Sequence, residues 1–318
     1  MRIVVPSGGI GAARFLLGLR HAVPDAEITV IGNTADDITL FGLRVSPDLD
    51  TVMYTLGGGI DEQQGWGRAD ETFTLREEFA AYGVEPQWFT LGDRDLATHV
   101  VRTQMLGAGF PLSQVTEALC ARWHPGVRLL PMTDDRVETH VIVEETQQRR
   151  ALHFQEWWVR LHAQPRALEI VPVGADEAKP GPGVLEAIAD ADLVLLPPSN
   201  PVVSIGTILA VPGIRDALVE TMAPVIGLSP IVAGSPVRGM ADKTLAAIGV
   251  PATAAGVALH YGADLLDGWL VDTSDAAAVE PVEAAGILCR GIPLLMTSVP
   301  ATAQMALAAL GLAAEVER

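Results

Sequence analysis

The chain has 318 residues, 49% of them hydrophobic and 5% aromatic, with a formal net charge of −18 at pH 7. This length suits a single α/β domain over 1–318 with an inserted lobe better than it suits two large domains. The acidic balance, without any run of Lys and Arg, argues against nucleic acid as a partner. Because there is no long apolar run and no signal-peptide pattern, we expect a cytoplasmic protein without membrane contact.

The N-terminus opens with a short apolar strand, a glycine cluster and a helical pattern. Residues 2–6 (RIVVP) predict a buried strand, residues 11–22 a helix and residues 27–33 a second strand. The helix has apolar positions at Phe15, Leu16 and Leu19. Strand, glycine turn, helix and strand within about 30 residues form a βαβ unit, which implies a parallel sheet.

The turn in this unit contains Gly8, Gly9 and Gly11. A nicotinamide dinucleotide fingerprint needs a third glycine where this chain has Arg14, and an acid at the end of the second strand, where it has Asn33. The Gly-Lys-Ser/Thr sequence of a Walker loop does not occur either. Two interpretations stay open: a phosphate site made of glycine amides and a helix N-terminus, or glycines that only turn the chain.

Acidic residues gather after the second strand. Asp36, Asp37, Asp48, Asp50 and Asp61 fall within 26 residues, among glycines and the turn-like segment SPDLDT. If that segment is extended, Asp48 and Asp50 point the same way. Carboxylates on loops beyond strand ends are what Mg²⁺ requires, usually with substrate phosphates as further ligands. The alternative is a set of exposed loop acids.

The middle of the chain differs in pattern, and we expect an inserted lobe over about 60–165. Residues 68–122 alternate helical patterns with loops, and residues 137–160 indicate a hairpin. In the segment LGDRDLATH, mixed charge surrounds a predicted helix start, where Asp93 or Asp95 could be a cap.

Cysteine and histidine give weaker signals. Cys120 and Cys289 are far apart, and neither has a second Cys at metal-ligand spacing, so we expect two buried free thiols in a reducing cytosol. His153, which is close in sequence to two tryptophans, is better explained by core packing than by catalysis.

The strand and helix pattern returns in the C-terminal part. We predict a helix followed by a strand over 184–200 and again over 214–231, helices over 239–249 and 252–261, strands over 267–272 and 291–296, and a last helix from about Ala301. With the N-terminal unit these elements predict a Rossmann-like, doubly wound, mostly parallel sheet with an inserted, mainly helical lobe. Ser199 and Asn200 follow one buried strand and Ser229 follows the next, where loops of open α/β sheets bind ligands.

Several long and unusual motifs resemble those of a known family. GGIGAARFLLGL, GLRVSPDLDTVMYTLGGGID, GWGRADET, WFTLGDRDLATHVVRTQML, HFQEWWVR, SNPVVSIGTILAVPGIRDAL and SPIVAGSPVRGMAD together resemble the 2-phospho-L-lactate transferase family, most closely its actinobacterial phosphoenolpyruvate transferase branch of coenzyme F-420 biosynthesis. The similarity runs from residue 1 to about 300. One departure is Ala35, which stands where close relatives usually have glycine before the two acids.

The resemblance implies group transfer at phosphorus. The donor would be a guanosine 5′-diphosphate ester of enolpyruvate or lactate, and the ribityl hydroxyl of Fo (7,8-didemethyl-8-hydroxy-5-deazariboflavin) would attack its distal phosphorus with release of GMP. Such a displacement needs positioned phosphates, a divalent ion and in-line geometry. Phosphoenolpyruvate, 2-phospho-L-lactate and 3-phospho-D-glycerate all stay open as the acid, because pocket contacts discriminate between them. The actinobacterial likeness favours enolpyruvate.

The resemblance also implies roles for particular residues. Mg²⁺ would be held by Asp36, Asp37, Asp48 and Asp50, with Asp48 and Asp50 as the catalytic pair. Fo would contact Asp50 and Phe89. The donor phosphates would lie at Gly8, Gly9 and Gly11, and the guanosine at Ser199, Asn200 and Ser229. A homodimer is also expected. The alternative from another class is a non-catalytic regulatory protein that shares the core and binds nucleotide-type ligands.

Overall fold

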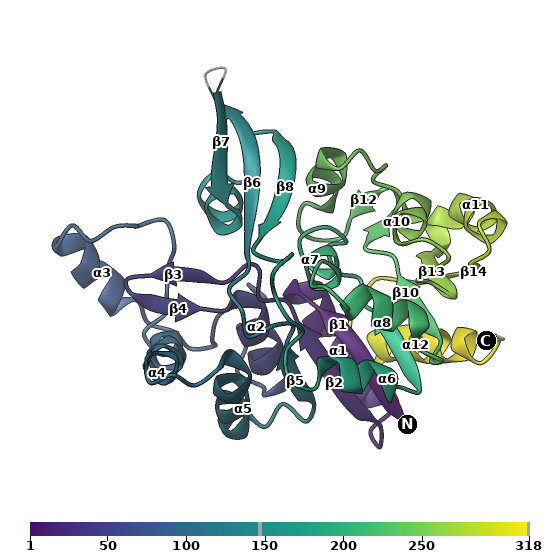
Figure 1. Ribbon diagram of the computed structural model, residues 1–318, viewed down its shortest axis with the longest axis horizontal. Coiled ribbons are helices and arrows are strands. Elements are labelled where there is room, and N and C mark those ends of the chain that lie inside the picture. Colours follow the sequence, from purple (N-terminus) through teal and green to yellow (C-terminus); the bar gives the residue numbers. More distant parts are fainter. Residues whose placement is uncertain (146–147, 317–318) are drawn as a thin grey trace.

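The structure is a computed structural model that describes residues 1–145 and 148–316. At its centre is a seven-stranded sheet in the order β14-β13-β10-β9-β1-β2-β5, in which the paired strands run parallel (Figure 1). Its strands are β1 (Arg2–Ser7), β2 (Glu27–Gly32), β5 (Arg128–Pro131), β9 (Leu193–Leu196), β10 (Val225–Leu228), β13 (Gly268–Asp272) and β14 (Leu288–Ile292). The predicted Rossmann-like, doubly wound fold class is confirmed.

The strand order reverses at β1. The chain passes from β1 to β2 and β5 on one side of the sheet, and later to β9, β10, β13 and β14 on the other. Ile3 of β1 pairs with Ile28 of β2 and with Leu193 of β9. In open α/β sheets ligands bind beyond the carboxyl ends of the strands at such a reversal. The loops after β1, β2 and β9 are therefore where a binding site is expected.

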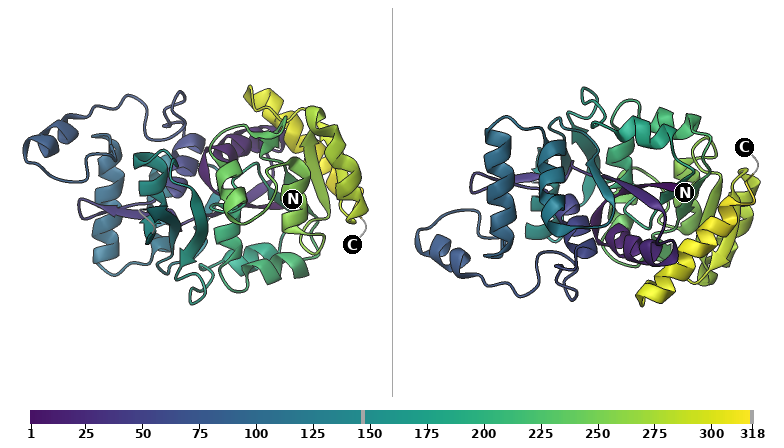
Figure 2. Two further views of the ribbon diagram at one scale, coloured as in Figure 1. Left: turned by 90° about the horizontal axis from the view of Figure 1, so that it is seen from above. Right: turned by 90° about the horizontal axis from the view of Figure 1, so that it is seen from below.

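Helices cover both faces of the sheet, because successive strand residues point to two separate cores. One face holds Ile3 and Val5 under α1 (Gly9–Ala22), α2 (Pro47–Leu56), α5 (Leu112–Trp123) and α12 (Val299–Ala313). The other holds Val4 under α6 (Val184–Ala189), α7 (Ile205–Leu209), α8 (Ile214–Glu220), α9 (Ala241–Ala247), α10 (Ala254–Tyr261) and α11 (Val279–Ala284). Figure 2 shows α1 and α12 side by side. Within the described chain, every helix is too short or too polar to cross a membrane.

Two glycines let α1 approach its neighbours closely. A Cβ at Gly11 would lie 2.3 Å from the Pro198 carbonyl oxygen, and a Cβ at Gly18 would lie 2.5 Å from the Thr302 side chain. Gly11 therefore permits packing on the loop after β9, and Gly18 permits packing on α12. In a dinucleotide fingerprint the third glycine lets the helix pack closely on its strand. This chain has Arg14 at that position, and α1 makes its close contacts at Gly11 and Gly18 instead.

Segments between β2 and β9 form further structure beside the sheet. β3 (Ile38–Leu40) pairs with β4 (Leu43–Val45) in a hairpin, and α3 (Thr74–Ala81) and α4 (Asp95–Gly107) follow α2. A three-stranded antiparallel sheet projects from the molecule in Figure 1 and has the order β7-β6-β8. It consists of β6 (Glu138–Glu145), β7 (Gln148–His153) and β8 (Ala167–Val173).

Smaller elements complete the described chain. A π-helical turn spans Glu156–Arg160, a 3-10 helix spans Thr273–Ala278, and β11 (Ile231–Val232) pairs with β12 (Ser235–Pro236). Within the range 60–165, β5 is an edge strand of the central sheet, while β8 lies just outside that range and pairs with β6. The division of the chain into a core and a lobe over about 60–165 stays a prediction.

Most of the predicted elements are present, two predictions are wrong in detail, and one condition is not met. Residues 291–296 are not one strand, because β14 ends at Ile292 before Pro293, which has no N–H for the sheet. The hairpin predicted over 137–160 ends at His153, and residues 156–160 are helical. SPDLDT is not extended but begins α2, with Pro47 in its first turn.

Both cysteines are free thiols, as expected. Cys289 is buried, whereas Cys120 is only half-buried.

Candidate active site

The loops after β1, β2 and β9 meet at the reversal of strand order. Asn33, directly after β2, joins them: its Nδ2 donates to Asp48 Oδ2 at 2.9 Å and to the Val203 carbonyl at 3.2 Å. Its Oδ1 accepts a hydrogen bond from the Thr207 hydroxyl at 2.9 Å. Asp48 Oδ1 accepts a hydrogen bond from the Gly9 amide at 2.9 Å, which places a negative charge at the favourable end of α1.

Because SPDLDT is helical, Asp48 and Asp50 do not point the same way. Residues two apart on an α-helix are rotated by about 200° around its axis. Asp48 faces the glycine turn, whereas Asp50 faces α4, where the Arg102 guanidinium contacts its Oδ1. The acidic residues are therefore divided between two places on either side of α2.

Asp36 and Asp48 form a pair of buried carboxylates. Their exposed fractions are 5% and 8%. Burial, and then the charge of Asp48, raise the pKa of Asp36. Burial raises the pKa of Asp48 to about 6, although hydrogen bonds from Asn33 and Gly9 oppose this. Among the described residues no ion pair neutralises either carboxylate, and Asp36 Oδ1 has no hydrogen-bond partner.

Asp37 and Asp50 have arginine partners instead. Asp37 Oδ2 accepts hydrogen bonds from Arg44 Nε at 3.1 Å and from the Ser46 hydroxyl at 2.7 Å. Burial raises the pKa of Asp37 to about 6 even though the charge of Arg44 lowers it. Asp50 pairs with Arg102, which is only 1% exposed. Two carboxylates and two guanidinium groups thus balance one another here.

The donor groups indicate where Mg²⁺ would fit. Over residues 1–145 and 148–316, no three His, Cys, Asp or Glu side chains are grouped as a metal site. Mg²⁺ is nevertheless commonly held by one or two carboxylates together with substrate phosphates. Asp36 and Asp48 fit this pattern, because they lack a cation and Asp36 has a free oxygen. Asp37 and Asp50 fit it less well, because arginines already contact them.

Of the three glycines expected to contact phosphates, Gly9 alone borders open space. A Cβ there would meet nothing within 4 Å, and its φ of +73° lies in the region that favours glycine. A Cβ at Gly8 would lie 2.6 Å from Ser204 Cβ, and Gly11 is packed on Pro198. Gly8 and Gly11 are therefore needed for packing, and the phosphate contacts of all three stay a prediction.

Two arginines flank the glycine turn. Arg14 Nη2 donates to the Glu62 carbonyl at 3.4 Å, and Arg238 donates to the Gln64 carbonyl. Arg238 also lies 5.7 Å from the ring centroid of Trp66. Burial, and then the charge of Arg14, lower the pKa of Arg238. Neither guanidinium forms an ion pair within the described chain, so both charges are available to an anion.

The residues expected to hold guanosine lie at the ends of β9 and β10, with their side chains engaged by the protein. Ser199 Oγ donates to the Gly8 carbonyl, Asn200 Oδ1 accepts from the Val202 amide, and Ser229 Oγ donates to the Ile231 carbonyl, each at 2.9 Å. These bonds fix the shapes of the two loops. Contact between these residues and guanosine stays a prediction.

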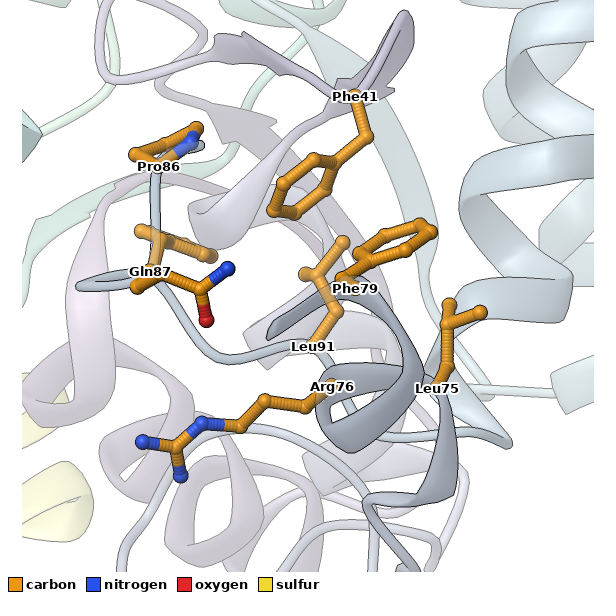
Figure 3. Close-up of a pocket in the computed structure, with 8 residues that line it drawn as sticks. Phe41, Leu75, Arg76, Phe79, Pro86, Gln87 and Leu91 are labelled. Atoms are coloured by element: carbon orange, nitrogen blue, oxygen red, sulfur yellow. The ribbon is translucent and has the colours of Figure 1, made fainter. Parts of the chain in front are cut away.

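Phe89 belongs to an apolar cluster beside the β3–β4 hairpin. With Phe41, Phe79 and Leu91 it lines a hollow of about 10 Å³, drawn in Figure 3. The rings of Phe41 and Phe79 are 4.7 Å apart. Because this volume holds about one water molecule, it is too small to enclose a deazaflavin ring, and contact between Phe89 and Fo stays a prediction.

The loop that contains Asp36 and Asp37 is held from β7. His153 Nδ1 accepts from the Gln155 amide at 3.1 Å, so its proton is on Nε2, which lies 3.2 Å from the Asp37 carbonyl oxygen. His153 thus has a structural contact next to the site. Ala35 has no positive φ and donates its amide to Asn33 Oδ1 at 2.9 Å, so the departure from glycine is accommodated.

Several buried polar residues of this region were given no role in the site from the sequence. Asn33, Tyr54, His99 and Arg102 contact the four aspartates or their partners. Asp93 caps α3, since it accepts from the Thr74 and Leu75 amides at 3.0 Å. Asp95 is not a simple cap but accepts the Tyr54 hydroxyl at 2.6 Å. The signal that could have revealed this group is the spacing Asp95, His99, Arg102, which is one helical face.

Comparisons with known proteins agree over the whole chain. Residues 3–286 match the family model described as 2-phospho-L-lactate transferase CofD. Phosphoenolpyruvate transferases of Streptomyces griseus subsp. griseus and Streptomyces coelicolor are each 73% identical to this chain over 316 residues, which cover 99% of this chain and 99% of each relative. That of Thermobifida fusca is 65% identical over 325 residues, 100% of this chain and 99% of the relative.

A solved structure agrees with the fold. A protein of the UPF0052 family from Bacillus halodurans superimposes with a TM-score of 0.64 at 18% identity, covering 97% of this chain and 98% of its own. At this identity the likeness concerns the fold alone.

Proposed function

Since the chain belongs to the 2-phospho-L-lactate transferase family, we propose that it transfers a phosphoenolpyruvyl or 2-phospho-L-lactyl group from a guanosine 5′-diphosphate donor to the ribityl hydroxyl of Fo in coenzyme F-420 biosynthesis, releasing GMP. The names of its near full-length relatives favour enolpyruvate as the acid. The structural observation that supports the proposal most directly is the uncompensated Asp36–Asp48 pair beside the glycine turn.

The transfer exchanges one bond at phosphorus for another. The hydroxyl oxygen of Fo bonds to the distal phosphorus of the donor, and the bond from that phosphorus to the GMP oxygen breaks. The hydroxyl proton leaves, and the product is a phosphodiester between the acid and Fo. The protein contributes mainly by positioning the reactants and stabilising charge.

Asp36 and Asp48 would hold Mg²⁺ together with the donor diphosphate. When bound, the ion supplies positive charge to the phosphate oxygens and balances the two carboxylates. Asp48 is already fixed by Asn33 and by the Gly9 amide. The proposed metal position is next to the start of α1, and two further positive charges are close to this turn: Arg14 is on α1, and Gly65 is near both Ile10 and Arg238.

Asp50 would orient the Fo hydroxyl and accept its proton. Arg102 holds Oδ1 of Asp50, while Oδ2 has no hydrogen-bond partner among the described residues. Phe89 and its apolar neighbours would support the deazaflavin ring at the rim of their hollow. The loops of Ser199, Asn200 and Ser229 would border the guanosine.

The experiment is direct. We expect the purified protein, supplied with Mg²⁺, Fo and each of the three donors, to release one GMP for every charged deazaflavin product, as measured by chromatography. Enolpyruvate should be preferred. A regulatory protein of the alternative class would bind GDP without releasing GMP, so absence of turnover with all three donors would contradict the proposal.

We also propose that the protein is a cytoplasmic homodimer. Light scattering should then give twice the chain mass of 33.6 kDa. A single species at the chain mass would contradict the dimer.

A further inference from the structure

A buried polar array connects α4 to Asp50. Asp95, His99 and Arg102 lie on one face of α4, and Asp50 and Tyr54 lie on the facing side of α2. His99 and Arg102 are each only 1% exposed. Buried ionisable groups are costly unless they are paired, so such an array requires an explanation.

The contacts run through the array without interruption. The Tyr54 hydroxyl donates to Asp95 Oδ1 at 2.6 Å, and His99 Nε2 lies 3.2 Å from Asp95 Oδ2. Arg102 Nη1 lies 3.2 Å from His99 Nδ1, and Arg102 Nη2 contacts Asp50 Oδ1. His99 Nδ1 is also 3.8 Å from Asp50 Oδ2.

These contacts determine which nitrogen of His99 carries the proton. A guanidinium group can only donate hydrogen bonds, so Nδ1 of His99 must accept from Arg102. The proton of a neutral imidazole is then on Nε2, which lies 3.2 Å from Asp95 Oδ2 without being aligned for a hydrogen bond. His99 therefore accepts from Arg102 at Nδ1 and carries its proton on the side of Asp95. It does not donate to Asp50.

Asp95 is fixed at both of its oxygens. Burial alone would raise its pKa, but the neighbouring His99 ring, the hydrogen bond from Tyr54 and the charge of Arg102 together lower it. An ionised Asp95 accepts from Tyr54 at Oδ1, while its Oδ2 lies 3.2 Å from His99 Nε2. Asp95, the member of the array farthest from Asp50, thus keeps the His99 ring in place.

From this geometry we propose that Asp95, His99 and Arg102 are positioning residues that hold the Asp50 carboxylate in one orientation, with its Oδ2 free of protein donors. The inference rests on the proposed function, in which Asp50 receives the Fo hydroxyl. Arg102 also donates to the Arg44 carbonyl at 3.4 Å, which ties the array to the β3–β4 hairpin.

Two substitutions of His99 separate positioning from other roles. His99→Gln keeps an acceptor for Arg102 and a donor for Asp95, whereas His99→Leu has similar bulk and keeps neither. We expect His99→Leu to lower kcat by roughly 10- to 100-fold with the KM values for Fo and donor changed less than about threefold. His99→Gln should stay within roughly fivefold of the parent kcat. His260→Leu, on α10, is the control and should leave both constants unchanged.

Kinetic results can also overturn the proposal. A folded His99→Leu protein with the kcat of the parent would show that the array does not act on Asp50. A folded His99→Gln protein as impaired as His99→Leu would show that the imidazole itself is needed, contrary to a positioning role. If His99→Leu fails to fold, Tyr54→Phe removes one hydroxyl of the array with its shape kept, and should lower kcat by roughly 3- to 10-fold at unchanged KM.

A spectroscopic measurement tests the array without any turnover. Nitrogen-15 spectra of the histidine-labelled protein at pH 7.5 contain seven side chains, and the His99 signals are those missing from His99→Gln. We expect a neutral ring with the proton on Nε2. A proton on Nδ1 would overturn the proposal. If the parent protein shows the expected tautomer but transfers no group, the proposed function is wrong, and the array has a structural role only.

Discussion

At the residue scale, the placement of arginines decides what each of the four aspartates can do. Arg44 and Arg102 neutralise Asp37 and Asp50, while Asp36 and Asp48 have no cation and the charge of Asp48 raises the pKa of Asp36. A buried carboxylate next to another destabilises the fold unless a ligand compensates it. The proposed binding of an ion at this pair would therefore relieve a cost in stability that the free protein bears.

Asp36→Asn should make the free protein more stable and the enzyme inactive. The folded-state pKa of Asp36 is raised by burial and by Asp48, so the stability that its proton contributes is present at low pH and is lost as pH rises through the folded pKa. Asparagine does not ionise, so the Asp36→Asn protein does not lose stability in this way as pH rises. We expect a gain on the order of 1–3 kcal/mol at pH 7.5 that shrinks towards pH 5, measured by urea denaturation.

Asp25→Asn, in an exposed turn, is the matched control and should give no gain at either pH. A loss of stability in Asp36→Asn at pH 7.5 would mean that the carboxylate is already compensated in the free protein.

Mg²⁺ should couple to nucleotide binding through the same pair. GDP adds negative charge beside Asp36 and Asp48, so we expect calorimetry to show at least tenfold tighter GDP binding with Mg²⁺ than with a chelator. Asp36→Asn should reduce this ratio. Asp50→Asn should keep it, although transfer is lost, because Arg102 already contacts Asp50 in the free protein. An equal loss of coupling in both variants would place Asp50 among the metal ligands.

The residue types of the site were predictable, but their partners were not. Composition and spacing indicated the acids, and their position after β2 indicated a crevice. Whether Asp48 and Asp50 diverge depends on SPDLDT being helical, and a six-residue segment with Ser and Pro suits both a turn and a helix start. His99 and Arg102 were harder to assign, because only the packing of α4 on α2 brings them to Asp50.

At the element scale, the glycines of α1 set how closely helices can pack. Gly11 and Gly18 have protein atoms where a Cβ would be, whereas Gly311 in α12 has none within 4 Å. Glycine inside a helix otherwise costs stability compared with alanine. The same substitution should therefore have opposite effects at different positions.

Gly11→Ala should destabilise the protein by about 1–3 kcal/mol, because the new methyl group would overlap the Pro198 carbonyl and push α1 away from the loop after β9. Gly311→Ala should be neutral or stabilise by up to about 1 kcal/mol. Thermal and urea unfolding of both variants provide the comparison. If Gly11→Ala and Gly311→Ala were equally stable, the loop after β9 would be able to move away from the new methyl group without loss of stability.

Element boundaries were less predictable than element types. The buried strands and amphipathic helices of the core follow from periodicity, because each has one face on a core. The end of β14 and the π-helical turn after β7 depend on Pro293 and on the burial of Trp157, whose exposed fraction is 0%. Such local effects of tertiary packing leave little periodic signal in the sequence.

At the scale of the whole molecule, donor and acceptor would bind to different parts of the chain. The glycine turn, Asn33 and the loops after β9 and β10 belong to the central sheet. Phe89, Asp50 and α4 belong to the structure built beside it. α2 lies between them, with Asp48 on one side and Asp50 on the other. Sequence patterns indicated the two parts but not this junction.

This arrangement predicts that binding of the two substrates can be weakened separately. Arg238→Gln removes a charge beside the glycine turn and should weaken GDP binding by roughly 5- to 50-fold, the range for one partly exposed charge-assisted contact. It should leave Fo binding unchanged.

Phe89→Ala removes apolar area from the rim of the hollow and should weaken Fo binding by a similar factor with GDP binding unchanged. Fo is followed by its fluorescence and GDP by calorimetry, with Phe110→Ala, an exposed aromatic elsewhere, as the control for Phe89. If each variant weakened both ligands equally, the donor and acceptor would share one pocket, and the division of the molecule at α2 would be wrong.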